Sequence, residues 1–219
     1  MESSITLVKD FRNSSYTTYD FNLGDKKEKF INEFRKTHPR AQNIYLSIKN
    51  KQGFFNKSFR SIYFEKCVYC GINTQVIDSS KFEVDHFIPE SILKAEMGFE
   101  YSYINGIENL VNSCQMCNRN KSDFMTDDEN RQLLHPDNNN LPTIFERIDD
   151  YSIEVSNEYI NNNEILRFYM TLNLDNQLRR LDYLIMEMKD FCDKYQTESI
   201  VNDIQRLILK IESKRRRNY

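Results

Sequence analysis

The sequence has no tryptophan, and its 219 residues include only 5 glycines and 4 prolines. So few turn-forming residues argue against a collagen-like or linker-like chain and against a turn-dense all-β fold. Long hydrophobic runs are missing too, since no stretch approaches the ~18 consecutive apolar residues of a membrane span. Residues 1–10 lack the basic and apolar segments of a secretion signal. The sequence therefore predicts a cytoplasmic protein that has no membrane partner.

An excess of basic charge is also absent. The chain has 30 Lys and Arg residues against 33 Asp and Glu residues, for a net charge of -3. This balance excludes a uniformly basic coat for nucleic acid but leaves local basic patches open. Residues 25–60 form one such patch, in which phenylalanines alternate with Lys and Arg. The pattern is typical either of a solvated helix face over an aromatic core or of a phosphate-contacting surface beside a site.

Apolar residues are plentiful, at 39% of the chain, with 13% aromatic, which is enough for a sizeable packed core. Their spacing predicts a mainly helical, basic flank over residues 1–60, a mixed centre over 61–126 and a C-terminal hairpin with helices over 127–219. In the N-terminal and central parts, the predicted elements are a helix capped by Asp25, a helix over 41–49 and a strand over 82–89. In the C-terminal part they are a hairpin over 143–155, a helix over 164–171, a helix that begins after a cap at 173–175, and a helix over 199–214.

Four of the five cysteines lie in two CxxC pairs, Cys67 with Cys70 and Cys114 with Cys117. In a reducing cytoplasm such pairs are metal ligands or redox groups more often than disulfides. Four thiolates suit a tetrahedral Zn²⁺ and leave no open position, so we expect zinc to be structural. Residues 71–113 separate the pairs, further than the ~15–20 residues of a simple zinc ribbon. Additional structure is therefore expected between them.

A predicted strand between the pairs ends in Asp85-His86. Adjacent strand residues point to opposite faces, so a turn or distortion is needed to bring both side chains to one site. Asn105-Gly106 reads as a hairpin-type turn, and the second cysteine pair is followed at once by Asn118. An isolated Asp-His pair is a weak signal, and a lone histidine is more often structural. The order of these motifs adds the context.

This order resembles the HNH endonuclease family. The chain shows CVYC, EVDHFIP, IENLV and SCQMCNRNKSD in the family's sequence of motifs, over residues 67–124. The spacing of Asn109 and Asn118 is that of members in which Asn replaces the last His of the name. The resemblance implies an α+β fold, with a ββα-metal core closed by a four-cysteine zinc site and helical N- and C-terminal flanks.

The chemistry of phosphodiester hydrolysis assigns roles to the matching residues. His86 is the candidate general base, because its ordinary pKa of ~6.5 suits proton abstraction near neutral pH. Asp85 and Asn118 supply the hard oxygen ligands that Mg²⁺ or Mn²⁺ prefers. Asn109 is expected to orient the His86 ring through its amide. Lys121 is expected either to contact a phosphate or to lie in solvent.

The expected substrate is DNA, although RNA and the number of strands cut stay open. A zinc-stabilised binding module without catalysis and a redox or regulatory zinc protein are the alternatives; the latter leaves Asp85-His86 unexplained. Residues 133–181 loosely resemble the tails of HNH proteins encoded beside ATPases in anti-phage systems of the Septu and retron kind, which implies an ATPase partner. The main alternative there is a stand-alone or restriction-type nuclease. The apolar rows of residues 164–219 predict either an internal core or a docking surface for a partner or a second copy.

Overall fold

The computed structural model describes residues 9–41, 43–97 and 101–217. Its N-terminal part contains three helices, α1 (Gly24–Thr37), α2 (Ile44–Ile48) and α3 (Phe54–Ile62). Phe30 and Phe34, one turn apart on α1, are buried against α3. The sequence had predicted that Asp25 caps α1, and this prediction was wrong. The N-cap is Leu23, and Asp25 lies in the first turn, where its negative charge interacts favourably with the helix dipole.

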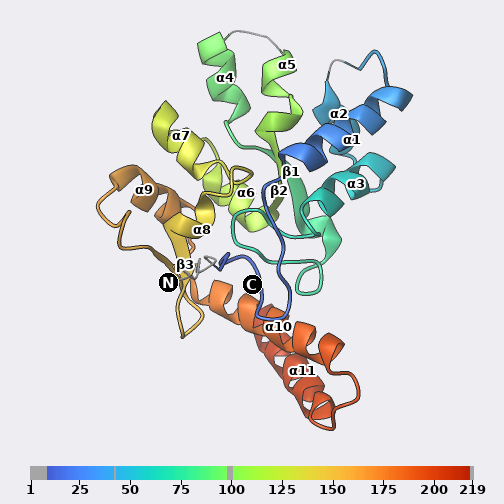
Figure 1. The fold of residues 1–219 in the computed structure, drawn as a ribbon, viewed down its shortest axis with the longest axis vertical. Coiled ribbons are helices and arrows are strands. Elements are labelled where there is room, and N and C mark those ends of the chain that lie inside the picture. The colour runs from blue at the N-terminus through green and yellow to red at the C-terminus, as the bar shows by residue number, and fades with distance from the viewer. Residues whose placement is uncertain (1–8, 42, 98–100, 218–219) are drawn as a thin grey trace, which may run out of the picture.

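The centre of the molecule is a two-stranded antiparallel sheet with a helix packed on it (Figure 1). β1 (Phe82–His86) follows the short helix η1 (Ser79–Lys81) and pairs with β2 (Leu110–Cys114). α6 (Gln115–Lys121) leaves β2 directly and contacts both strands. The side chain of Cys114 caps this helix, because its sulfur accepts the amide of Cys117. This ββα arrangement confirms the predicted fold class.

The connection between the two strands is longer than the sequence had indicated. It contains α4 (Glu90–Met97), α5 (Tyr101–Ile104) and η2 (Ile107–Asn109). Asn105-Gly106 is therefore not a hairpin turn, and the prediction was wrong on this point. The two residues follow α5 and lead into η2, which brings the chain back to β2.

The C-terminal part begins with α7 (Asp128–Leu134) and α8 (Leu141–Ile144). The predicted hairpin is confirmed by β3 (Phe145–Arg147) and β4 (Ile153–Val155), which pair antiparallel. Three helices follow: α9 (Asn163–Thr171), α10 (Gln177–Lys194) and α11 (Val201–Arg217). The cap of α10 is Asn176 and not residues 173–175, because the Asn176 side chain accepts the amide of Leu178.

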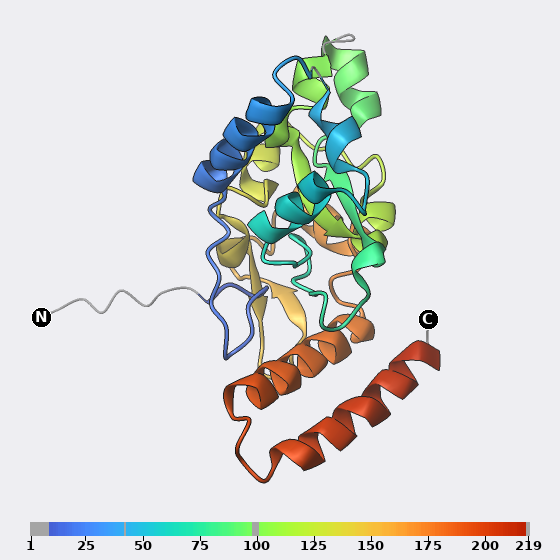
Figure 2. The ribbon, with the colours of Figure 1, turned by 90° about the vertical axis from the view of Figure 1, so that its right-hand side faces the viewer.

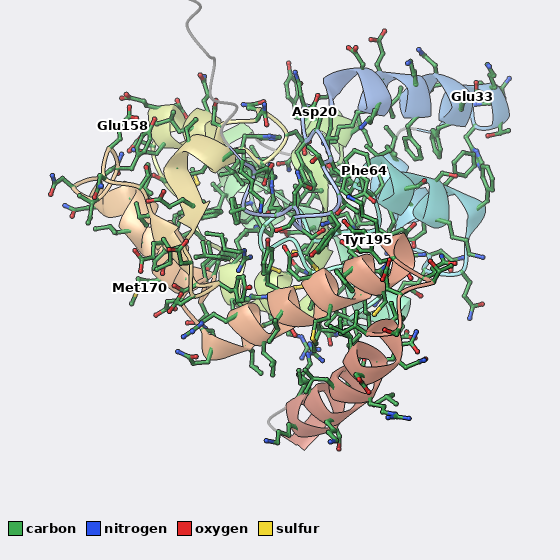
Figure 3. The ribbon with its side chains drawn as sticks, turned by 60° about the horizontal axis from the view of Figure 1, so that its bottom comes forward. Asp20, Glu33, Phe64, Glu158, Met170 and Tyr195 are labelled. Carbon is green, nitrogen blue, oxygen red and sulfur yellow. The ribbon has the colours of Figure 1, made fainter. Side chains whose placement is uncertain are left out.

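The large hydrophobic core contains buried residues from the N-terminal helices, the central sheet and the C-terminal hairpin with α9. α10 and α11 form a helical hairpin at one end of the molecule (Figure 2). Their apolar rows pack on each other around Ile185, Val201 and Ile208, so these rows form an internal core. Leu207 and Leu209 on α11 stay 48% and 66% exposed. Within the described ranges, no helix combines the length and apolarity that crossing a bilayer requires.

Candidate metal centre and active site

The four paired cysteines meet in one buried cluster. The sulfurs of Cys67, Cys70, Cys114 and Cys117 all lie within 4.8 Å of one another. The first pair lies in a turn after α3, and Gly71 closes this turn with a φ of +78°. A Cβ atom on Gly71 would lie 2.6 Å from the Cα of Arg12. Both the positive φ and this close approach therefore require glycine at position 71. The second pair joins the end of β2 to the first turn of α6.

A buried arginine from the C-terminal hairpin contacts this cluster. Arg179 on α10 is 3% exposed and donates to the sulfurs of Cys70 at 3.0 Å and Cys117 at 3.1 Å. Burial lowers the pKa of Arg179, but the four sulfurs outweigh it and hold that pKa well above its usual value. A buried cation here fits a negatively charged sulfur cluster. The four cysteines could thus bind a metal such as zinc, whose tetrathiolate complex carries net negative charge.

The acidic side of the central sheet lies beneath α6. Glu83 and Asp85 are two positions apart on β1, so their side chains point to the same face of the sheet. The Asn118 amide nitrogen donates to the Glu83 carboxylate at 2.7 Å, and the Gln115 amide donates to the other oxygen at 3.2 Å. Asp85 accepts the hydroxyl of Tyr69 at 2.9 Å. Burial raises the pKa of Asp85 to about 6, although nearby cationic and hydroxyl donors oppose the shift.

Lys121 has a structural role that the sequence did not reveal. It is 2% exposed, and its ammonium lies 3.4 Å from the Asp85 carboxylate. It also donates to the main-chain oxygens of His86 at 2.9 Å and Phe87 at 3.2 Å. Lys121 is therefore neither solvated nor available to a phosphate, and both expectations for it were wrong. It fixes the chain where β1 ends.

His86 lies at the end of β1, on the face opposite Asp85. The strand register continues without a bulge to the pair His86–Leu110, so the expected distortion is absent from the β1–β2 pairing. The half-buried imidazole lies against the ring of Tyr45 from α2, with centroids 4.5 Å apart. Its Nε2 is 3.1 Å from Oδ1 of Asn105. Burial lowers the pKa of His86, which keeps the ring neutral at pH 7, as a general base requires.

Asn109 does not orient His86 as predicted. Its amide oxygen accepts the main-chain N–H of Ile88 at 2.8 Å, and its amide nitrogen donates to the carbonyls of Ile88 at 3.0 Å and Ile104 at 3.1 Å. Asn109 thus holds the main chain after β1, and Asn105 makes the contact with the ring. The exchange occurs because η2 turns Asn109 toward the backbone.

The sequence reasoning missed four residues that contact this region. Glu83 could have been found, because strand alternation places it on the face of Asp85. Asn105 was noted only as a turn residue. Tyr45 and Arg179 belong to helices outside the motifs. The apolar pattern of such a helix indicates which of its residues are buried, but it does not show which residues of the site they contact. Tyr45 also lies near the carboxylates of the site, since after burial Glu90, Glu83 and Asp85 raise its pKa.

Comparison with known proteins finds a family model that matches the centre of the chain. Residues 67–124 match the family model described as HNH endonuclease. No curated protein and no solved structure matches the chain. The matched span begins at the first ligand cysteine, includes the paired strands and ends just after α6. The ββα unit and its four-cysteine cluster therefore form an HNH endonuclease domain, which indicates a nuclease.

Proposed function

We propose that the protein is a divalent-metal-dependent endonuclease that hydrolyses phosphodiester bonds of DNA. The observation that carries the proposal is the environment of His86. A neutral imidazole is held by Asn105 and Tyr45 at the end of the strand whose other face carries Glu83 and Asp85. The end of β1 therefore carries both kinds of group that metal-assisted phosphodiester hydrolysis requires, a neutral base on one face and acidic oxygen donors on the other.

In this proposal His86 deprotonates the attacking water. If Nε2 carries the hydrogen and donates it to Asn105, Nδ1 is the atom that accepts the proton from water. Tyr45 packs against the ring and limits its rotation. The two contacts thus select one tautomer and one orientation of the base, which is the role that the sequence had assigned to Asn109.

Asp85 and Asn118 would hold a Mg²⁺ or Mn²⁺ ion, which stabilises the negative charge that develops on the phosphate. Asn118 gives its amide nitrogen to Glu83, so its amide oxygen is the ligand atom that remains. Tyr69 and Lys121 fix the direction of the Asp85 carboxylate. Glu83 offers a further oxygen on the same face. These oxygen donors suit a hard cation, whereas the cysteine cluster suits structural zinc.

The test is cleavage of supercoiled plasmid DNA by the purified full-length protein with its zinc retained. We expect no cleavage before a divalent ion is added and cleavage after addition of Mg²⁺ or Mn²⁺. An RNA transcript incubated in parallel decides between the two nucleic acids. Folded, zinc-containing protein that binds DNA but cleaves neither substrate with either ion would contradict the proposal and favour the binding module without catalysis.

Asn105→Ala is expected to slow cleavage by about 10–100-fold, the usual effect of losing a group that orients a functional imidazole. Asn105→Asp should recover part of this loss, because a carboxylate also accepts from Nε2. Asn109→Ala should instead lower the free energy of unfolding by about 1–3 kcal/mol, because buried main-chain groups lose their partners. Single-turnover rates over a range of pH, together with melting curves, separate these effects. Equal rates for Asn105→Ala and wild type would exclude the positioning role.

We also propose an ATPase partner and a role in anti-phage defence, on the looser resemblance of residues 133–181. The exposed apolar side chains of Leu207 and Leu209 on α11 offer one surface for such a partner or for a second copy. A second copy would provide the second site that a double-strand cut needs. Size-exclusion chromatography with light scattering on the lone chain tests self-association, and a monomer that cleaves both strands efficiently would argue against both partners.

A further inference from the structure

A groove of about 900 Å³ lies between the C-terminal hairpin and the HNH domain. One wall is the loop of residues 72–78, which precedes η1, and the opposite wall carries Glu212 and Arg215 of α11. The outer side of α6 contributes Gln115, Met116, Arg119 and Asn120. Figure 2 shows α11 running beside α10, with the C-terminal end of α11 on the same side of the molecule as the central domain.

The walls of this groove are held in place by ionic contacts. Lys189 on α10 bridges the two sides, because it pairs with Glu212 at 2.6 Å and donates to the main-chain oxygen of Gln75. Arg215 pairs with the buried carboxylate of Asp182. These contacts fix α11 relative to the loop of residues 72–78, so the groove exists before any ligand binds.

The groove also meets the candidate active site. Gln115 lines it and at the same time donates to Glu83, on the acidic face of β1. Lys81, which lines the groove as well, is the residue directly before β1. The groove and the acidic face of β1 are therefore adjacent, so a chain-like ligand could contact both.

The charge of the groove favours a polyanion. Of its cationic side chains, Lys81 and Arg119 are exposed, and neither forms an ion pair within the part of the chain that the structure describes. Arg179 and Arg215 also line the groove, but both are buried and their charges are met by the sulfur cluster and by Asp182. The anionic side chains Asp78 and Glu212 are engaged, one in capping η1 and the other with Lys189.

We propose that this groove holds the sugar–phosphate backbone of the nucleic-acid strand on one side of the scissile bond. Lys81 and Arg119 contact successive phosphates, and the apolar wall of Val76, Ile77 and Met116 receives the faces of unpaired bases. The inference rests on the proposed nuclease function, which supplies the strand. It assigns to the C-terminal hairpin a direct part in substrate binding.

The test measures binding apart from cleavage. Full-length protein carrying His86→Ala, with zinc retained, is titrated onto a short fluorescein-labelled DNA strand and onto its duplex, and anisotropy is followed at several salt concentrations. Lys81→Ala/Arg119→Ala in this background should weaken binding about tenfold near 0.1 M salt and flatten the plot of log K against log salt by about 1.4 for the single strand. Arg206→Ala/Lys210→Ala, on the exposed side of α11, removes the same charge and should leave both quantities unchanged.

A second variant tests the position independently of the exposed cations. Asn120→Glu adds a negative charge inside the groove, whereas Asn202→Glu adds it on the outer side of α11. Only the first should weaken binding. Equal affinities for the groove variants and their controls, or wild-type protein that binds an acidic peptide but not DNA, would overturn the proposal. If the groove variants lose affinity while the wild type cleaves nothing, the groove inference stands and the proposed catalysis falls.

Discussion

His86→Ala is expected to slow metal-dependent cleavage by about 10²–10⁴-fold, the usual contribution of a general base. The structure gives the reason, because burial lowers the pKa of this imidazole, which lies against Tyr45 and contacts Asn105. The loss should appear in the single-turnover rate with DNA and metal both saturating, since the substitution removes the base and leaves Asp85 and Asn118 in place.

His38→Ala provides the matched control. His38 is exposed at the C-terminal end of α1 and stacks on Phe34. Its removal should leave the rate unchanged. Zinc content and melting temperature, measured on both variants, check that folding is intact. A His86→Ala protein that is folded and cleaves at the wild-type rate would refute the assigned base.

Cys114→Ser is expected to abolish folding or to yield insoluble protein. Structural zinc sites supply about 10–16 kcal/mol of binding free energy at pH 7, which is as large as the whole stability of about 5–15 kcal/mol of an ordinary domain. Cys114 carries two functions, since its sulfur belongs to the candidate metal cluster and also caps α6. Removing zinc from wild type with a chelator should lower the melting temperature in the same way.

Cys192→Ser is the control for this prediction. Cys192 is also buried, at 6% exposure, but it lies in the small core between α10 and α11 and outside the cluster. Its loss should cost far less stability and no metal. Elemental analysis that finds about one zinc ion per chain in wild type and in Cys192→Ser confirms the assignment. Soluble, folded wild-type protein without zinc would contradict it.

The sequence predicted those parts of the molecule whose cause is local. The CxxC pairs and an alternating strand that ends in Asp85-His86 follow from neighbouring residues. The ββα unit itself was expected from the resemblance to the HNH family. The same kind of reasoning located the β3–β4 hairpin and the amphipathic helices α9, α10 and α11, whose apolar rows recur at helical spacing.

The residues whose roles were not predicted owe those roles to tertiary structure. Nothing in the order of residues shows which of two nearby asparagines reaches the His86 ring, because that depends on how η2 turns Asn109 toward the chain after β1. Asn105 was interpreted only as a turn residue, because it is followed by Gly106. Arg179 and Lys121 are cations that a sequence places at the surface by default. Each becomes buried only because a fold brings sulfurs or a carboxylate to it.

The position of Arg179 in the chain also determines when the cysteine cluster is covered during synthesis. A chain grows from its N-terminus, and domains fold during synthesis, so all four cysteines emerge well before the helix that carries Arg179. At that stage the sulfurs are complete as ligands but still lack their covering cation. If the cysteines bind a metal, the ion can enter from this open side before Arg179 reaches the sulfurs. Loading and sealing of such a centre would then be separate events, set by the position of one arginine along the chain.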